Sequence, residues 1–479
     1  MTHHAGNATF TPTPPAARGA VTGIDTLAER VRGPVLRPGD IGYVEECSGF
    51  QTAFQQRPSV VVGATGADDV RAAVEYAVER DLPVGVQASG HGAPFTVEGG
   101  VLITTGRMDG VCVDAEARTA RLEAGVPWRR VVAEAARHGL APLNGSGPNV
   151  GAVSYTLGGG LGLLARRYGY AADHVRAIDV VTADARLRHV TAASDADLFW
   201  ALRGGRDNFG VVTGLEVDLV PVNRIYGGSL VFDGDLVEDV LRAYLEWTRS
   251  LPEELTSSVA TVVYPDIPQL PDHLRGRYVA QVRIAYMGDA AEGERLVAPL
   301  RALGPRLKDT LAEMPYATSG SIYEEPTTPH AYCGDNALLR RLDDSLVRPL
   351  VDLTGPAAPA MCVFEIRHLG GALSRPPSVP NAVGHREARY ILRILSPLGD
   401  PGTVRPVHKR VLAQVEPWTM GTSLNFVFGC GEPPSPARVR AAYGAGDYAR
   451  LTELKANYDP ANTFRINHNI RPEGTPFPM

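Results

Sequence analysis

Residues 83–93 read PVGVQASGHGA. The apolar run Leu82–Val86 is typical of a short buried strand, and the small residues that surround His91 follow it without a break. Side chains this small allow another molecule to approach the backbone closely. The stretch therefore predicts a strand that leads into an open loop carrying a single imidazole.

The residues before this stretch complete a strand–helix–strand unit. Residues 59–65 are predicted to form a buried strand, and residues 68–80 a helix, because Val70, Val74 and Ala77 recur at helical spacing. Residues 83–88 form the second strand, which runs directly into the loop with His91. This order is typical of a parallel strand pair joined by a crossover helix.

Two further glycine-rich stretches follow within the first 210 residues. Residues 145–162 read GSGPNVGAVSYTLGGGLG, in which seven of eighteen are glycine, and residues 203–210 read RGGRDNFG. Such a composition favours neither a helix nor a regular strand. A tight turn that lets two strands pack explains any one of these loops. Three of them together favour a dinucleotide held across several loops, since backbone N–H groups in such loops bind phosphates.

The chain changes character after Pro221. Residues 278–286 and 388–395 alternate as strands do, and residues 235–249 and 291–303 have the apolar spacing of amphipathic helices. This region predicts an antiparallel sheet with helices on one face, and the whole chain an α+β fold. A helix over residues 447–457 and the polar segment NYDPANTFRINHNIRP complete the sequence.

Composition excludes several classes of function. Of 479 residues 44% are hydrophobic, and the formal net charge is −6, which argues against a nucleic-acid or anionic-membrane partner. No apolar run is long enough to span a membrane. Neither GxSxG nor HExxH occurs, and the spacing of the five cysteines indicates no metal site and no disulfide framework, so we expect a cytoplasmic protein without a metal. The cysteines are Cys47, Cys112, Cys333, Cys362 and Cys430.

At this point the sequence resembles a known family, the berberine-bridge-enzyme-like FAD-linked oxidases of the vanillyl-alcohol-oxidase superfamily. The resemblance runs from about residue 38 to the C-terminus. The blocks that carry it are RPSVVV at 57–62, PVGVQASGH at 83–91, TLGGGLG at 156–162, DLFWALRGG at 197–205, NFGVVT at 208–213, EIRHLGGA at 365–372, HR at 385–386 and YDPANTFRIN at 458–467.

The resemblance implies a domain organisation. A two-lobe PCMH-type FAD-binding domain is expected over residues 36–222 and a substrate-binding domain over residues 223–430. Residues 431–479 then return to the FAD-binding domain. Residues 1–35 are expected to be a disordered leader, because the N-terminus is rich in Thr, Pro, Ala and Gly.

The resemblance also implies the cofactor and its contacts. His91 is the expected covalent attachment point of FAD, through the flavin 8α-methyl carbon; the alternative is a loop histidine that binds only water. The other residues expected to contact FAD are Ala88, Ser89, Gly90, Gly92, Ala93, Gly145, Ser146, Gly147, Val150, Gly151, Tyr155, Gly158, Gly159, Gly160, Gly162, Gly210, Val211, Val212, Asn467 and Asn469.

Two departures from the family pattern concern the cofactor. Gln87 stands where many relatives carry arginine, which removes a positive charge near the flavin. Gly147 stands where relatives with two covalent links carry a cysteine, and no other cysteine is near it in sequence. We therefore expect monocovalent FAD, attached through His91 alone.

The oxidation needs a base for the substrate proton. The family often carries a tyrosine in an Asn-Tyr pair before the last helix, and this chain has Asp447-Tyr448. Tyr448 is therefore the first candidate for the base, with packing against the helix as the equal alternative. Tyr390 and His368 are further catalytic candidates. Arg367 and His368 lie on opposite faces of one strand, so at most one of them faces the site.

The sequence thus predicts an FAD-dependent oxidase of a medium-sized organic substrate, a neutral secondary metabolite, with O2 as oxidant and H2O2 as product. The alternatives are a flavin-dependent monooxygenase, a redox-neutral cyclase on the same scaffold, and a degenerate flavin-containing binding protein. The expected partners are the small-molecule substrate and O2, and the expected assembly is a monomer or homodimer.

Overall fold

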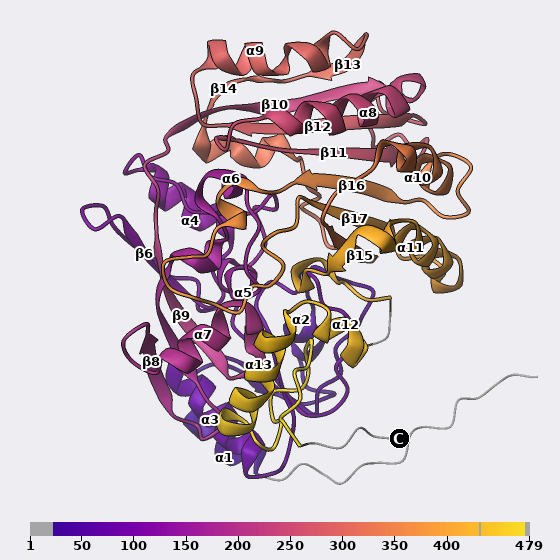
Figure 1. The fold of residues 1–479 in the computed structure, drawn as a ribbon. Helices are drawn as coiled ribbons and strands as arrows, with labels where there is room; N and C mark the ends of the chain where they lie inside the picture. The colour runs from indigo at the N-terminus through magenta and orange to yellow at the C-terminus, as the bar shows by residue number, and fades with distance from the viewer. Residues whose placement is uncertain (1–22, 431–432, 475–479) are drawn as a thin grey trace, which may run out of the picture.

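The strand–helix–strand unit forms the first lobe of the structure, a computed structural model that describes residues 23–430 and 433–474 (Figure 1). The buried strand β2 (Val60–Gly63) leads into α3 (Ala67–Val78), and β3 (Val84–Gln87) runs parallel to β4 (Val101–Thr104). The sheet order is β1-β2-β4-β3, with β1 (Val35–Leu36) antiparallel at the edge. Helix α2 (Tyr43–Cys47) precedes β2.

The predicted leader is too long. Helix α1 (Ile24–Arg30) is folded, and Leu27 is buried in the core of the first lobe. The carboxylate of Asp69 accepts hydrogen bonds from the backbone N–H groups of Arg32, at 2.9 Å, and Gly33, at 3.3 Å, which ties this segment to α3. Residues 1–22 lie outside the described residues.

A five-stranded antiparallel sheet forms the second lobe, in the order β5-β6-β9-β7-β8. Its strands are β5 (Val111–Asp114), β6 (Thr119–Glu123), β7 (Val175–Val181), β8 (Leu187–Thr191) and β9 (Val211–Asp218). The accompanying helices are α4 (Trp128–Ala136), α5 (Ala152–Leu157), α6 (Ala165–Tyr168) and α7 (Ala196–Gly205).

Helix α5 lies within the glycine-rich stretch for which no helix was predicted. Its six residues stand between Gly151 and Gly158, and four of them are buried. The Thr156 hydroxyl donates to the Ala152 carbonyl at 2.8 Å. Tertiary burial of a short apolar face therefore overrides the composition of the surrounding loop.

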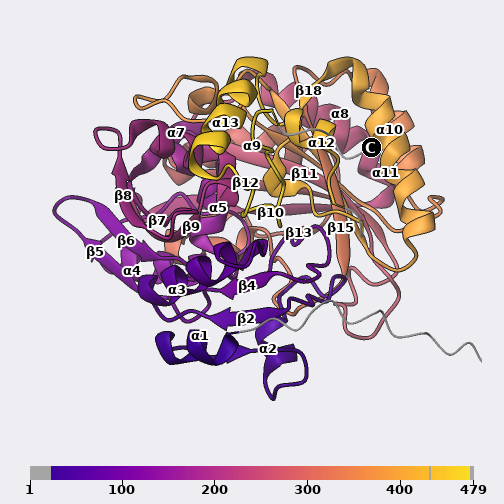
Figure 2. The same cartoon turned by 90° about the horizontal axis from the view of Figure 1, so that it is seen from below.

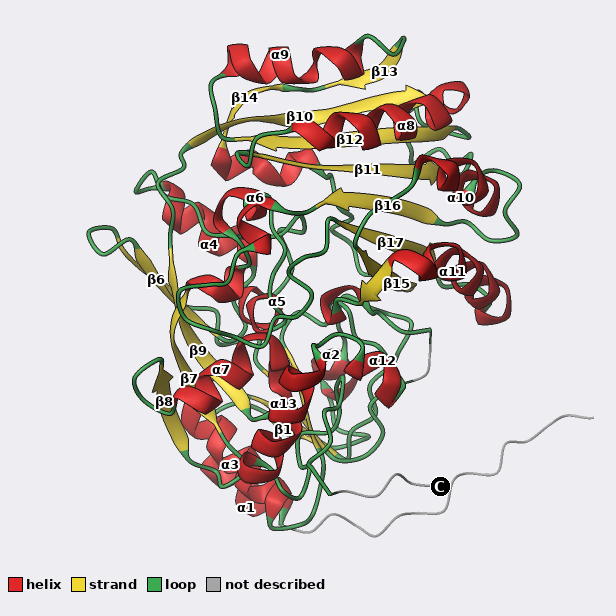
Figure 3. Ribbon diagram, viewed as in Figure 1, coloured by secondary structure: helices red, strands yellow, loops and turns green. Residues whose placement is uncertain are grey.

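The third sheet has nine antiparallel strands, as the alternating pattern after Pro221 predicts. They are β10 (Arg224–Asp233), β11 (Leu255–Val263), β12 (Tyr278–Tyr286), β13 (Arg306–Asp309), β14 (Ala312–Pro315), β15 (Tyr332–Leu339), β16 (Val363–His368), β17 (Tyr390–Pro397) and β18 (Thr419–Gly421). Four helices pack on one face: α8 (Val237–Trp247), α9 (Ala290–Arg301), α10 (Val347–Thr354) and α11 (Pro401–Val415) (Figures 1 and 3). The predicted α+β class is confirmed.

Strand alternation gives this sheet two chemically different faces. Phe364 and Ile366 of β16 and Leu392 of β17 belong to the apolar core under the helices. Their neighbours Arg367 and Arg393 must therefore lie on the opposite face. That second face is turned toward the two N-terminal lobes (Figure 1).

The C-terminal segment returns to the second lobe. Helices α12 (Pro436–Arg440) and α13 (Ala445–Tyr458) contribute Val439, Leu451 and Leu454 to the same core as α7 and β9 (Figure 2). Beyond α13 the Thr463 carbonyl accepts a hydrogen bond from the Val84 N–H at 2.9 Å, so the segment also reaches β3.

A buried ion pair fixes this return. The Lys455 ammonium donates to the Asp459 carboxylate at 2.6 Å, to the Asn208 carbonyl at 2.6 Å and to the Phe464 carbonyl at 3.0 Å. Both charged side chains are fully buried. Asp459 accepts further hydrogen bonds from the N–H groups of Thr463 and Phe464.

In the parts of the chain that the structure describes, no helix has the length and apolar character needed to cross a membrane.

We expect Lys455→Met to lower the free energy of unfolding by about 3–5 kcal/mol, because the Asp459 carboxylate stays buried without its cation. Lys455→Met/Asp459→Asn should regain part of this loss, since both charges are gone. Lys409→Met, at an exposed position of α11, is the control. Urea unfolding measures all three. If Lys455→Met and Lys409→Met unfolded at the same urea concentration, the Lys455–Asp459 pair would not be needed for stability.

Candidate active site

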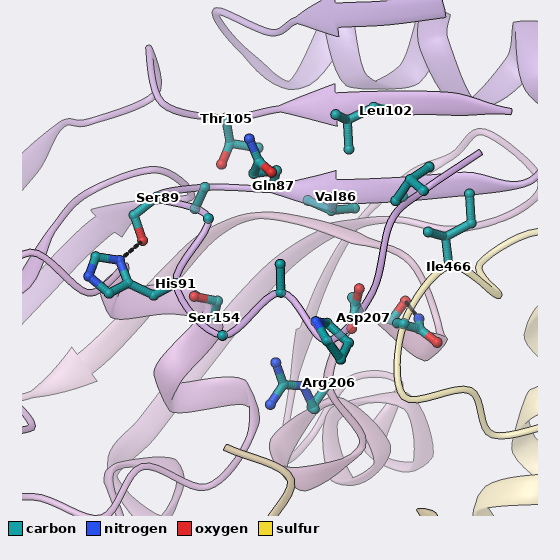
Figure 4. Close-up of a pocket in the computed structure, with 18 of the residues that line it drawn as sticks. Val86, Gln87, Ser89, His91, Leu102, Thr105, Ser154, Arg206, Asp207 and Ile466 are labelled. Atoms are coloured by element: carbon teal, nitrogen blue, oxygen red, sulfur yellow. Dashed lines mark hydrogen bonds between the residues drawn. The ribbon is translucent and has the colours of Figure 1, made fainter. Parts of the chain in front are cut away.

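A first cavity, of about 1090 Å³, lies where the two N-terminal lobes meet the C-terminal segment. Figure 4 shows Val86 and Leu102 of the first lobe on one wall, Arg206 and Asp207 opposite, and His91 at one end. The lining residues are Gln56, 85–95, Val97, Leu102, Thr105, Ala124, Val153, Ser154, Leu157, Arg206, Asp207, Val212, Ile466, Asn467 and His468.

The loop after β3 forms one side of this cavity because its glycines permit a backbone that other residues would strain. Gly90 has φ +70°, and a Cβ atom on it would lie 2.5 Å from the Gly49 Cα. The Ser89 carbonyl accepts from the Phe50 N–H at 3.0 Å. The Gln87 amide donates to the carbonyls of Cys47 and Ser48, which anchors the start of the loop to the end of α2.

Two contacts hold the His91 imidazole. Its ring stacks on Phe50 with the centroids 3.8 Å apart and 12° between the planes, and its Nδ1 forms a 2.9 Å hydrogen bond with the Ser89 hydroxyl. Burial, followed by the proximity of His330, lowers the pKa of His91 to about 4. The imidazole is therefore neutral at physiological pH, with a lone pair available.

Two residues that line the first cavity carry buried polar atoms without partners. Asn467 donates its amide N–H to the carbonyl of Asp207 at 3.3 Å, but its Oδ1 is buried and accepts no hydrogen bond within the described residues. The Arg206 Nε is also buried and has no hydrogen-bond partner within the described residues. One terminal nitrogen of Arg206 donates to the Asn425 side chain at 2.7 Å. Burying a polar atom without a hydrogen bond lowers the stability of the fold, unless a ligand supplies the missing partner.

A second cavity, of about 1130 Å³, lies between the first and the polar face of the third sheet. Four residues line both cavities: His91, Gly92, Ser154 and Arg206. The other lining residues are Phe50, 145–150, Tyr155, Leu161, Glu325, Pro326, His330, Tyr332, Arg367, Arg393, Leu395, Leu424, Asn425, Phe426 and Phe428. The two cavities therefore share a wall at His91.

The structure brings together most of the residues predicted to contact a cofactor. Ala88, Ser89, Gly90, His91, Gly92, Ala93, Val212 and Asn467 line the first cavity, and Gly145, Ser146, Gly147, Val150 and Tyr155 line the second. Gly151 lies behind Ser89, to whose hydroxyl its N–H donates at 3.2 Å. Gly210, Val211 and Asn469 line neither cavity.

The glycines of residues 158–162 also line neither large cavity, and their packing explains why they are needed. A Cβ atom on Gly160 would lie 2.5 Å from the Tyr155 ring, and one on Gly158 would lie 2.0 Å from the Asn425 amide. A Cβ on Gly162 would meet the Asn144 carbonyl at 2.4 Å, and one on Gly159 the Val383 side chain at 3.3 Å. These glycines make room for Tyr155 and Asn425, which themselves line the second cavity.

None of the three predicted catalytic residues lines either large cavity. Tyr448 packs in the first turn of α13, beside the Tyr443 ring and under the Arg440 guanidinium. The Tyr390 hydroxyl is paired with the buried Thr248 hydroxyl at 2.8 Å. His368 Nε2 lies 3.0 Å from an Arg166 nitrogen, and burial with Arg166 and Arg389 lowers its pKa to about 2. Of the strand neighbours Arg367 and His368, only Arg367 lines the second cavity.

Sequence reasoning missed many residues of the second cavity, among them Glu325, Arg393, Asn425 and Phe426. Asn425-Phe426 is an Asn–aromatic pair inside the cavity, whereas Asp447-Tyr448 lies outside it. Asn425-Phe426 is similar to the Asn-Tyr pair expected from the resemblance, with phenylalanine as its second residue. This signal was present in the sequence, 22 residues upstream of the pair that was chosen.

The cysteines are free thiols in the structure, but two of them are not isolated. The ligand atoms of Cys333, His408 and Cys430 all lie within 4.8 Å of one another. Strand β15, helix α11 and the segment after β18 supply one residue each, so their spacing in sequence gave no indication of the group. In the described part of the chain, no cysteine lines either large cavity.

Comparison with known proteins agrees with this geometry. Residues 58–191 match the family model for an FAD binding domain, and residues 425–471 match the model described as berberine and berberine like. Both matched regions contribute walls to the first cavity.

Two relatives and a solved structure are similar over nearly the whole chain. (R)-6-hydroxynicotine oxidase of Paenarthrobacter nicotinovorans is 29% identical, with 93% of this chain and 98% of the relative covered. Chitooligosaccharide oxidase of Gibberella zeae is 24% identical over 96% of each chain. The crystal structure of 6-hydroxy-D-nicotine oxidase from Arthrobacter nicotinovorans superimposes with a TM-score of 0.80 at 26% identity, covering 92% of this chain and 98% of the other.

His468, on the wall of the first cavity, predicts a loss of stability in acid. Burial, and then Arg206, lower its pKa to about 3, against about 6.5 in an unfolded chain. Between these values only the unfolded state takes up the proton, so this contribution to stability falls as pH drops below 6.5. His468→Gln should flatten the dependence by up to about 1.4 kcal/mol per pH unit.

Urea unfolding between pH 7 and 5 measures this slope, with His138→Gln at an exposed position as the control. Identical slopes for the wild type and His468→Gln would contradict the assignment of a neutral, buried imidazole.

Proposed function

The chain belongs to the berberine-bridge-enzyme-like FAD-linked oxidoreductases, and on that premise we propose that it oxidises a medium-sized organic molecule with O2 as the final electron acceptor. One observation carries this proposal: the two large cavities share the wall formed by His91, Gly92, Ser154 and Arg206. A cofactor in the first cavity and a substrate in the second would meet there.

The first cavity fits FAD by the chemistry of its lining. The loop of residues 88–93 brings backbone close to the cavity, as glycines with positive φ allow. The unpartnered Oδ1 of Asn467 is an acceptor for an N–H or O–H group of the ligand. When bound, FAD supplies a hydride acceptor that O2 can reoxidise, with H2O2 as the product.

His91 is the proposed covalent attachment residue. Its depressed pKa keeps the ring neutral, so a nitrogen lone pair is available as nucleophile, and the Phe50 stack and the Ser89 hydrogen bond fix the ring. In forming the bond, the imidazole gives up its N–H proton and the 8α-methyl carbon one hydrogen. O2 takes up the two electrons and both protons as H2O2.

The proposed attachment is single. Gly147 lines the second cavity at the position where a cysteine would make a second link. A Cβ atom on Gly147 would lie 2.9 Å from the Val150 side chain. No cysteine in residues 23–430 and 433–474 lines either cavity.

Glu325 is the proposed proton acceptor in the oxidation. It is the carboxylate among the described residues that line the second cavity, and the Ser146 hydroxyl donates to its Oε1 at 2.8 Å. The substrate C–H bond would give up a hydride and its neighbouring O–H or N–H a proton, which leaves a C=O or C=N product. The placement of Tyr448, Tyr390 and His368 outside the cavity favours Glu325 over all three.

Oxygen accounting separates this proposal from the two enzymatic alternatives. An oxidase releases one H2O2 for each O2 consumed, a monooxygenase places oxygen in its product, and a cyclase consumes none. A cytoplasmic location and a monomeric or dimeric state are predictions from the sequence alone.

Acid precipitation tests the attachment. We expect the wild-type pellet to stay yellow and the His91→Ala pellet to be colourless, with its FAD in the supernatant. His330→Ala is the matched control, because His330 also contacts Phe50 and lines the second cavity. A colourless wild-type pellet would overturn the covalent link while leaving FAD binding intact.

Glu325→Gln should lower kcat at least about 100-fold on any compound the wild type oxidises, because the amide cannot accept the substrate proton. FAD content should not change. Glu324→Gln is the control, because the neighbouring carboxylate pairs with Lys308 on the outside, at 2.7 Å. Rates of H2O2 formation measure the effect. Wild-type kcat in Glu325→Gln would assign the proton transfer to another group.

A further inference from the structure

Arg367 and Arg393 line the floor of the second cavity, and two further buried charged side chains, Glu365 and Arg283, lie against them. Glu365 accepts from the Arg367 Nε at 3.0 Å and from the Arg393 guanidinium, and an Arg283 nitrogen lies 3.7 Å from its other oxygen. The exposed fraction of each side chain is between 7% and 13%. We refer to Arg283, Glu365, Arg367 and Arg393 as the floor cluster.

The strand register assembles the floor cluster. Glu365 of β16 is the direct cross-strand partner of Arg393 of β17. Ser258 of β11 pairs with Arg367 on one side and with Arg283 of β12 on the other. All four charged residues lie on the face of the sheet opposite the helices, so no helix residue can neutralise them.

The floor cluster is not electrically balanced. Three guanidinium groups surround one carboxylate, and Arg206 adds a further cation to the cavity wall while Glu325 adds one anion. Two positive charges are therefore in excess. Taking unpaired ions out of water costs several kcal/mol each, and arginine cannot escape that cost by losing its proton.

The pKa shifts in the floor cluster differ between its arginines. Burial raises the pKa of Glu365, but Arg367, Arg393 and Arg283 outweigh it and hold the pKa at about 2. Burial lowers the pKa of Arg367, but Glu365 outweighs it and raises that pKa overall, so this guanidinium is well compensated. The pKa of Arg393 is lowered, first by burial and then by the neighbouring Arg367, so a further anion beside Arg393 would relieve this repulsion.

Hydrogen-bonding capacity is left unused at the same place. The Arg393 Nε is buried and has no partner in the described residues, and Arg367 reaches the cavity-lining Ser146 hydroxyl only at 3.5 Å. The Phe426 ring lies 4.1 Å from the Arg393 guanidinium carbon and 5.4 Å from that of Arg367, so it keeps water from one side of both. An anion placed here would bind in a medium of low polarity, where charge-assisted hydrogen bonds are strong.

We propose that Arg367 and Arg393 bind a carboxylate group of the substrate, so that the enzyme oxidises an organic acid rather than a neutral molecule. The planar guanidinium fork matches a carboxylate. Phe50, His330, Tyr332 and Phe428 line the same cavity and suit an aromatic or apolar body attached to that carboxylate. This inference rests on the proposed oxidase function and replaces the neutral substrate expected from the sequence.

Isothermal titration calorimetry of the FAD-containing enzyme with benzoate, benzamide and inorganic phosphate tests the proposal. Benzoate and benzamide have the same shape and differ in charge. We expect benzoate to bind at least tenfold more tightly than benzamide, and phosphate to bind more weakly than benzoate. Equal affinity for benzoate and benzamide would overturn the carboxylate site. Phosphate binding as tight as benzoate binding would overturn the assignment to a carboxylate in favour of a phosphate ester.

Two variants at one position keep the test independent of folding. Arg393→Met should abolish the preference for benzoate, and Arg393→Lys, which keeps the charge but loses the fork, should retain part of it. Arg410→Met, at an exposed position of α11, is the control. FAD absorbance reports the integrity of each variant. Wild-type preference in Arg393→Met would contradict the role of this residue.

Failure of this proposal is distinguishable from failure of the proposed function. An enzyme that retains FAD and forms H2O2 from some substrate, yet binds benzoate no better than benzamide, contradicts the carboxylate site alone. A protein that binds benzoate preferentially but never reduces its flavin contradicts the oxidase function alone.

Discussion

One buried cation organises the cofactor side of this molecule. The Lys455 ammonium is paired with the Asp459 carboxylate and with the carbonyls of Asn208 and Phe464, so a single side chain joins α13, the turn after α7 and the returning C-terminal segment. Three acceptors match the three N–H groups of the ammonium, which makes a fully buried lysine tolerable. The Asn208 amide extends the same junction, with hydrogen bonds to the His468 carbonyl and the Ile470 N–H.

This junction places the wall on which the rest of the site depends. Ile466, Asn467 and His468 close the first cavity against β3, and the opposite end of that cavity opens at His91 into the second. The two cavities then differ in character. The first combines exposed backbone with single polar atoms that lack partners, whereas the second combines aromatic rings with an excess of buried guanidinium groups. That division suits a cofactor on one side of His91 and an acidic substrate on the other.

Local features of the sequence were sufficient for the fold and for the cofactor loop. The strand–helix–strand unit, the loop with His91 and strand β12 were all predicted, because each depends on residues near in sequence. The cluster of charged residues at the second cavity was not predicted, because cross-strand register brings Arg283, Arg367 and Arg393 together and no periodicity reveals that register. Gly158 and Gly160 are predicted to contact the cofactor, and the structure shows that they also make room for Asn425 and Tyr155. Tyr448 was chosen by its motif, although the cavity holds Asn425-Phe426 instead.

The central claim is that FAD in the first cavity is bonded to the one histidine at the junction with the second. Mass spectrometry of a tryptic digest addresses it directly, because the fragment from Asp81 to Arg107 contains His91 as its single histidine and no cysteine. The account predicts that this fragment carries the mass of the flavin, with the fragment ions placing the addition on His91. An unmodified fragment from the yellow protein, or a flavin on any other fragment, would contradict it.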